Sequence, residues 1–187
     1  IVWVVTSKAD PSGFDDAVST EFGSTSGSLR QRYNGMVNIP LSDNAALRLV
    51  GFVRDEEGWV DNVGTGIDDA DALEESGFRA SLLWMVNDDL TATFGTIYQK
   101  SEPEDLSLSN TRSNIGSGTT FKPQYSDTEF TAHNLTVEYD MGFAELTSST
   151  SYFETETVQE NDLSSFLAAT PFPFPWGMIR DDTHDNL

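Results

Sequence analysis

Apolar and polar residues alternate along most of the chain, and apolar residues hardly ever recur at the i, i+3, i+4 and i+7 spacing of a helix. A period of two is typical of β-strands, whose successive side chains point to opposite faces. The pattern therefore predicts an all-β protein with seven strands. These strands cover residues 14–22, 31–41, 47–53, 77–86, 90–100, 130–139 and 143–158.

The alternation also predicts which side chains share a face of each strand. In residues 90–100, which alternate most cleanly, Phe94 falls on the more apolar face and Thr93 on the opposite one. The strand at 47–53 is expected to place Leu47, Leu49 and Val53 on one face and Arg48 on the other, together with Arg54, which directly follows the strand.

The predicted connections between strands alternate in length. Tight turns are expected at 42–45, 87–89 and 140–142, and long loops at 23–29, 55–75, 101–129 and after residue 158. Outer-membrane barrels have this organisation, with short periplasmic turns, long extracellular loops and strands of about 9–11 residues. The spacing thus predicts part of an antiparallel transmembrane β-barrel in which Phe94 contacts lipid and Thr93 faces the lumen.

Two stretches carry a more specific motif. Residues 38–62 match the order N-x-P-L-S-D, A-L-R, G-x-x-R and G-x-x-D-N through Asn38, Pro40, Leu41, Ser42, Asp43, Ala46, Leu47, Arg48, Gly51, Arg54, Gly58, Asp61 and Asn62. Residues 140–152 match D-x-G-x-A-x-L-T-S-x-T-S-Y through Asp140, Gly142, Ala144, Leu146, Thr147, Ser148, Thr150, Ser151 and Tyr152. In this order the two motifs resemble the early barrel strands of TonB-dependent outer-membrane receptors.

The resemblance implies a division of the chain and a function. The β-branched run at residues 2–11 predicts a short strand before these seven, and residues 1–11 resemble the end of the receptor plug through Val4, Thr6, Lys8 and Pro11. Residues 12–187 correspond to the first strands and loops of an incomplete barrel. A receptor of this family lies in the outer membrane of Gram-negative bacteria, surrounded by lipid. It takes up a scarce ligand, such as a metal chelate, a cofactor or an oligosaccharide, with energy from TonB, which contacts a plug segment absent from this sequence.

Composition narrows the function classes. The net charge of −21, from 31 acidic and 10 basic residues, argues against a nucleic-acid partner, because phosphate binding requires a basic face. No run approaches the roughly 18 apolar residues of a membrane helix. The mean hydropathy of −0.35 is compatible with both a soluble protein and a membrane barrel. The sequence opens on Ile1 rather than Met, and we expect it to be part of a longer protein.

The chain offers little catalytic or metal-binding chemistry. It has no cysteine, and its two histidines, His133 and His184, have no neighbours spaced as a triad or a zinc site. The acidic run at 68–75 lacks the glycine of an EF-hand loop, so a solvated acidic loop is favoured over a calcium site. We therefore expect a protein that is not an enzyme and has no cofactor, and the ligand-binding residues stay open.

The aromatic residues fit two architectures. Five aromatic residues lie near predicted strand ends or in loops: Trp59, Trp84, Tyr98, Tyr139 and Tyr152. A membrane barrel carries its aromatic girdles at such positions. The proline- and aromatic-rich stretch at 171–176 is a candidate for loop packing, membrane-boundary contact or ligand contact. The alternative is a soluble or cell-surface β-sandwich for adhesion or carbohydrate binding, which would pack the same aromatics between two sheets.

Overall fold

A computed structural model describes residues 6–105, 117–118, 120, 122, 124–162 and 177–186 of the chain. This part of the protein is all-β, as the alternation predicts. Its strands are β1 (Asp15–Thr25), β2 (Ser28–Ser42), β3 (Ala45–Glu56), β4 (Asp61–Asn62), β5 (Leu73–Met85), β6 (Leu90–Pro103), β7 (Ser117–Gly118), β8 (Ser126–Asp140), β9 (Glu145–Asp162) and β10 (Gly177–Asn186). The described residues contain no helix long and apolar enough to cross a bilayer.

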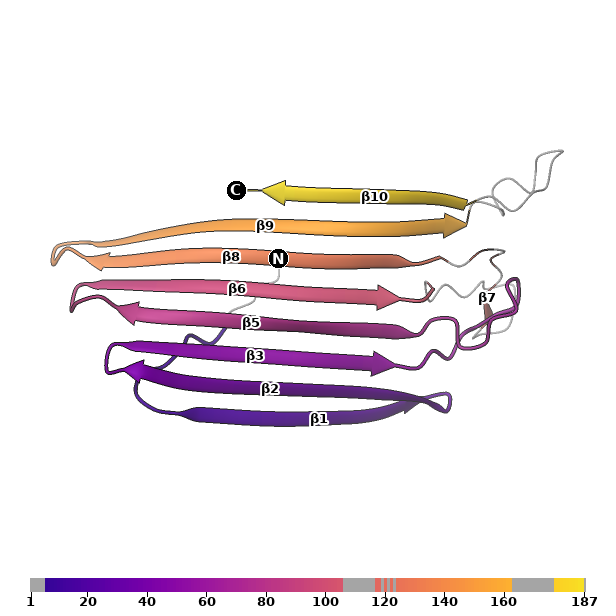
Figure 1. The fold of residues 1–187 in the computed structure, drawn as a ribbon, viewed down its shortest axis with the longest axis horizontal. Coiled ribbons are helices and arrows are strands. Elements are labelled where there is room, and N and C mark those ends of the chain that lie inside the picture. The colour runs from indigo at the N-terminus through magenta and orange to yellow at the C-terminus, as the bar shows by residue number, and fades with distance from the viewer. Residues whose placement is uncertain are drawn as a thin grey trace.

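Eight of these strands form one antiparallel sheet in the order β1-β2-β3-β5-β6-β8-β9-β10 (Figure 1). Each strand of this sheet pairs with the next one in the chain order, and the short β4 and β7 form a separate parallel pair beside it. Within the described residues the sheet is open, with β1 and β10 at its edges. No second sheet packs face to face on it there, so the sandwich architecture is not the one observed.

The sheet has one strand more than the alternation predicts. The segment after Val158 was expected to be a loop, but β9 continues to Asp162 and residues 177–186 form β10, which pairs with β9 along its whole length. Mixed polar residues such as Arg180 and Asp182 hide the period of two in β10. The stretch at 171–176 lies outside the described residues.

Tight turns join the strands at one end of the sheet, as expected. Asp43 and Asn44 connect β2 to β3, residues 86–89 connect β5 to β6, and residues 141–144 connect β8 to β9. In the last turn the φ angle of Gly142 is 79° and its N–H donates to the Asp140 carboxylate. A positive φ of this kind favours glycine.

The connection between β1 and β2 corrects the expectation of a long loop at residues 23–29. Both strands continue into this range and meet at a two-residue turn, in which φ is 56° at Ser26 and 104° at Gly27. Two positive φ values define the type I′ turn that matches the twist of a hairpin. The abundance of glycine and serine here therefore encodes a turn rather than a long loop.

The other two long connections are shorter than predicted, because the strands extend further. Asp55 and Glu56 belong to β3 and residues 73–75 to β5, while β6 runs to Pro103 and β8 begins at Ser126. The strands of the sheet contain 10 to 18 residues, against the expected 9–11. The strands therefore extend past the segments that the apolar alternation predicts.

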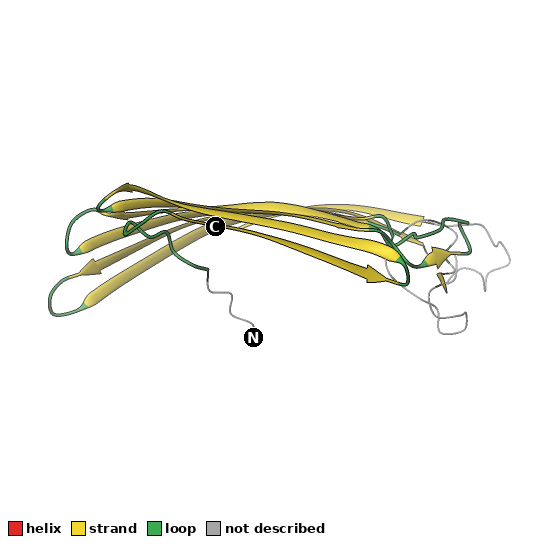
Figure 2. Cartoon of the chain, turned by 90° about the horizontal axis from the view of Figure 1, so that it is seen from below, coloured by secondary structure: helices red, strands yellow, loops and turns green. Residues whose placement is uncertain are grey.

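The register of the sheet defines two faces. We call the face that contacts residues 8–13 the inner face and the opposite one the outer face. Figure 2 shows the bowed sheet with the N-terminal segment running along one side of it. The outer face carries the exposed apolar residues Val18, Tyr33, Leu49, Val53, Phe78, Leu82, Trp84, Phe94, Leu135, Tyr139 and Leu146. The inner face is mainly polar and carries all six arginines of the described residues: Arg30, Arg32, Arg48, Arg54, Arg79 and Arg180.

Residues 6–10 form no strand, contrary to the strand expected at residues 2–11, whose first part lies outside the described residues. This segment crosses the inner face instead. Lys8 pairs with Glu138 of β8 at 3.2 Å, and the buried Asn38 side chain of β2 donates to the Asp10 carbonyl at 2.8 Å. Ala9 packs into the small buried cluster formed with Ala46 and Leu83.

Candidate functional site

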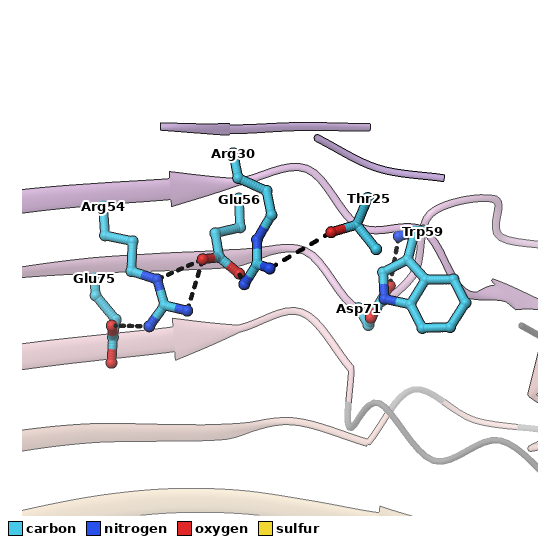
Figure 3. A network of polar contacts seen from close by, with 7 residues as sticks. All are labelled: Thr25, Arg30, Arg54, Glu56, Trp59, Asp71 and Glu75. Atoms are coloured by element: carbon cyan, nitrogen blue, oxygen red, sulfur yellow. Dashed lines mark hydrogen bonds and ion pairs between the residues drawn. The ribbon is translucent and has the colours of Figure 1, made fainter. Parts of the chain in front are cut away.

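A ladder of alternating charges crosses the inner face near the long loops (Figure 3). Arg30 of β2 lies opposite Glu56 of β3, and Arg54 of β3 lies opposite Glu75 of β5. Arg54 donates to Glu56 at 2.6 Å and to Glu75 at 2.8 Å, and Arg30 contacts the second oxygen of Glu56. Glu56 is therefore shared by two guanidinium groups.

The ladder sets the protonation of its central carboxylate. Burial alone would raise the pKa of Glu56, but the hydrogen bonds from Arg30 and Arg54 outweigh burial and hold this pKa below its ordinary value. The pKa of Arg54 is raised, first by its hydrogen bond to Glu56. Both shifts favour the charged forms of Glu56 and Arg54, so at neutral pH this pair presents a fixed acceptor and a fixed donor.

Two cavities open on either side of the ladder, and both are lined by Thr25, Arg30, Arg54 and Glu56. The first, of about 290 Å³, extends along β1 and β2 towards Glu21 and Arg32. The second, of about 280 Å³, extends under the β3–β5 loop, where Trp59 and Asp71 line it. The arrangement can hold a polar ligand between paired charges, with one aromatic side chain at the rim.

Acidic residues of the β3–β5 loop, part of which lines the second cavity, bind the backbone of the same loop. Asp71 accepts the backbone N–H groups of Trp59 and Val60 at 2.7 and 2.8 Å. The carboxylate of Asp61 accepts the N–H of Asp69. Part of the expected solvated acidic loop is thus folded back on itself.

A buried polar centre joins the long loops to one another. Asn62, only 3 % exposed, donates to the Asp105 carboxylate at 2.9 Å and to the Thr120 hydroxyl, and its amide oxygen accepts the N–H of Gly64. Asp105 also accepts the N–H of Gln124 at 3.0 Å. These contacts connect the β3–β5 and β6–β8 loops above the ladder.

The histidines lie apart from this site. His133 stacks on the outer face between Phe94 and Tyr152, with ring centroids 6.3 and 6.4 Å away, and His184 lies on β10. Among the described residues no group of three or more histidine, aspartate or glutamate side chains is placed to hold a metal ion. The acidic run at 68–75 contributes to no such group.

The aromatic residues expected in girdles divide between the sheet and the loops. Trp84 and Tyr139 lie on the outer face near the tight turns, and Tyr98 and Tyr152 lie on the same face towards the other end. Trp59 lies in the β3–β5 loop beside the ladder.

The ladder and the Asn62 centre were not predicted from the sequence. Arg54 and Glu56 are two residues apart on one strand, which signals a shared face, but their pairing with Arg30 and Glu75 depends on strand register. Asn62 is the last residue of the first motif, and nothing in its local sequence indicates burial. Comparisons with family models, with curated proteins and with solved structures gave no match for this chain.

Proposed function

We propose that the chain is part of the wall of an outer-membrane receptor barrel, with its outer face in lipid and its inner face towards the lumen. The observation that supports this proposal is an exposed apolar band on the outer face. Phe94 and Trp84, near the middle and the turn end of the band, are 45 % and 50 % exposed. Apolar patches of this extent are rare on soluble monomers and mark contacts with membranes or other proteins.

The length of the band fits a bilayer. On the outer face of β6 the stretch from Leu90 to Tyr98 has no charged residue, and neither does the stretch from Thr131 to Tyr139 on β8. Each contains nine residues, which agrees with the roughly 9–11 residues with which a tilted strand crosses the hydrocarbon core. Lys100 and Glu129 follow directly at the loop end.

The border between apolar and charged residues runs obliquely across the strands. Counted from the tight turns, the first charged residue of the outer face at the loop end is Glu74 on β5, Lys100 on β6 and Glu154 on β9. The strand register places Lys100 closer to the tight turns than Glu74, and Glu154 closer than Lys100. Barrel strands are tilted by about 35–45° to the membrane normal, so a planar membrane surface would cross them at this kind of slant.

The same proposal accounts for the polar inner face and assigns a role to the ladder. A barrel lumen is polar, and long loops at its outer mouth receive the ligand. We place the ladder, its two cavities and Trp59 at this mouth, where they contact a metal chelate, a cofactor or an oligosaccharide. The open edges at β1 and β10 require further strands to close the wall, because lipid cannot satisfy free backbone groups. The sequence resemblance alone implies that TonB supplies the energy for uptake.

Single cysteines in the full-length protein test the location and orientation. An impermeant thiol reagent added to intact cells should label Asp68→Cys, in the β3–β5 loop, and should not label Asp88→Cys, in the β5–β6 turn. Asp68 is preferable to Asp69, whose φ of 53° disfavours substitution. Both cysteines should react after the outer membrane is permeabilised. Labelling of Asp88→Cys alone on intact cells would reverse the orientation, and equal labelling of both would contradict the membrane placement.

A further inference from the structure

A shallow apolar hollow lies in the outer face over two facing glycines. Gly35 of β2 and Gly51 of β3 are directly opposite each other in the register and belong to the outer face. Val18 of β1 and Phe78 of β5 continue the same row on either side. These four residues line a space of about 550 Å³, which we call the glycine hollow. Two adjacent positions of the outer face therefore carry no side chain.

Local geometry does not explain the two glycines. Neither has a positive φ, and the pairing of β2 with β3 shifts only between Pro40 and Ser42, so no bulge lies here. A Cβ atom at Gly35 would have no heavy atom within 4 Å, and one at Gly51 would meet only the Gly77 carbonyl oxygen, at 3.8 Å. Glycine within a strand weakens it, and it marks a bulge, a bend or a site that a ligand approaches closely. The open space at both glycines favours the ligand site.

Pairs of aromatic rings hold the two walls of the glycine hollow in place. On one side Tyr33 packs edge-on against Phe22, with ring centroids 5.9 Å apart, and its hydroxyl donates to the Gln31 side chain at 2.9 Å. On the other side Phe78 packs against Tyr98, with ring centroids 5.8 Å apart. Because these contacts restrict the rings, the shape of the hollow is set before a ligand enters, which lowers the cost of binding.

The distribution of charge around the glycine hollow complements a lipid. Among the described residues, none that lines the hollow is charged. Charged residues of the outer face begin two positions beyond the lining residues Val53 and Tyr98, at Asp55 on β3 and Lys100 on β6. A lipid has the same arrangement, with an apolar chain joined to a charged headgroup. A peptide strand at this depth would leave its backbone groups without hydrogen-bond partners.

We propose that the glycine hollow binds one acyl chain of a membrane lipid, in the leaflet next to the long loops. The inference rests on the proposed placement of the outer face in lipid and adds a specific binding site to it. A chain that lies over Gly35 and Gly51 contacts side chains on both sides and fills a space whose lining would otherwise lose dispersion contacts. On β6 and β8, by contrast, Phe94 and Leu135 carry full side chains opposite each other, so the backbone there is covered.

Photo-cross-linking in the reconstituted full-length protein tests this site. The vesicles contain phosphatidylethanolamine and phosphatidylglycerol, with a small share of phosphatidylethanolamine that carries a diazirine midway along one acyl chain. Light converts the diazirine into a carbene, which attaches the chain to the nearest side chain, and mass spectrometry locates the adducts. We expect adducts at Tyr33 and Phe78, which line the hollow, and at Phe94 and Leu135, which represent the rest of the outer face.

Filling the hollow should separate these two groups of residues. Gly51→Leu should reduce the adducts at Tyr33 and Phe78 severalfold relative to the parent and leave those at Phe94 and Leu135 unchanged. The matched control is Gly95→Leu on the inner face, where a side chain also meets open space, and it should change neither group.

The other outcomes distinguish the binding site from the lipid placement. Adducts at Tyr33 and Phe78 that persist in Gly51→Leu would overturn the proposal and leave the lipid placement intact. A parent with adducts at Phe94 and Leu135 alone would also overturn it, because a partner protein or a second copy would then cover the hollow. A parent without adducts at any of these four residues would contradict the lipid placement itself.

A second variant covers the case in which Gly51→Leu does not assemble. Gly35→Leu fills the same hollow from the neighbouring strand and then decides the question by the same adducts. Failure of both variants to assemble would show that the glycines serve the backbone rather than a ligand, and this result would overturn the proposal.

Discussion

Phe94 and Gly95 are neighbours on β6, yet they lie on opposite faces of the sheet with opposite surroundings. Phe94 is exposed on the outer face among other apolar side chains, whereas Gly95 lies on the inner face opposite Ser81 and Asn134. In a soluble protein the covered face of a sheet is apolar and the open face is polar. Here the face that residues 8–13 partly cover is the polar one, and the open face is apolar. The proposed lipid contact of the outer face accounts for this inversion.

Placing a charge on each face in turn should give the largest difference between the two faces. Phe94→Arg puts a guanidinium near the proposed bilayer midplane, which costs about 2–4 kcal/mol in barrel proteins. We expect strongly reduced assembly of the full-length protein, measured as heat-modifiable folded protein in outer-membrane fractions. Gly95→Arg is the matched control, because a side chain there meets open space. Equal assembly of the two variants would remove the distinction between the faces.

The control differs from the one that the alternation suggests. The alternation places Thr93 in the lumen, where arginine would be tolerated, but its hydroxyl oxygen is buried without a hydrogen-bond partner among the described residues. A long charged side chain at Thr93 would disturb packing on the inner face. Gly95, two residues away on the same face, avoids this problem.

The Asn62 centre tests whether the loops can be loosened without affecting either face. Asn62→Ala removes hydrogen bonds to Asp105 and Thr120 and leaves a buried carboxylate less satisfied, at a cost of about 1–3 kcal/mol. We expect faster amide hydrogen exchange in residues 58–72 and unchanged exchange in the paired segments of β5 and β6. Asn87→Ala, in an exposed turn, is the control and should leave the long loops unchanged. Faster exchange throughout the sheet would show that loops and faces are one unit.

Ion pairs on the two faces should also differ in strength. Glu56→Gln removes the carboxylate that Arg30 and Arg54 share, and we expect a loss of about 1 kcal/mol because this carboxylate side chain is only 17 % exposed. Glu102→Gln removes a partner of Lys100 on the outer side whose side chain is 44 % exposed, and it should cost less because solvent screens exposed ion pairs. Chemical unfolding of both variants in detergent provides the comparison. A larger loss for Glu102→Gln would contradict the importance of the ladder.

Acidification should affect the two sides in opposite directions, with the smallest effects. The pKa of Glu56 is lowered, so its stabilisation is present at neutral pH and lost as the pH falls through that lowered value. The pKa of Asp127, on the outer side at the loop end, is raised by burial and by Glu102, so protonation of Asp127 favours the folded state. Stability of Glu56→Gln and Asp127→Asn, each compared with the parent between pH 7 and 3, should show these opposite slopes. Parallel slopes would show that neither shift affects folding.

The sequence predicts the strands and faces better than the site. Alternation places Phe94 and Thr93 on opposite faces correctly, because side-chain direction in a strand follows from local geometry alone. It misses β10, whose charged residues obscure the period, and the turn at Ser26 and Gly27, where the composition resembles that of a flexible loop.

The ladder and the Asn62 centre depend on contacts between distant parts of the chain. Glu56 meets Arg30 only through the register of β2 with β3, and Asn62 meets Asp105 only when two loops pack together. No local pattern encodes either contact. The two motifs mark the strands that carry these residues but do not assign them partners.

The accessibility of residue 94 in a bilayer tests the central claim most directly. Residues 1–187 contain no cysteine, so Phe94→Cys gives this part of the protein a single site for a nitroxide label. The labelled full-length protein is reconstituted in a membrane. Collision rates are then measured with oxygen, which concentrates in lipid, and with a water-soluble nickel chelate. We predict that oxygen collisions dominate at residue 94 and are markedly fewer at Gly95→Cys on the inner face. Dominant collisions with the nickel chelate at residue 94 would contradict a lipid-facing outer surface.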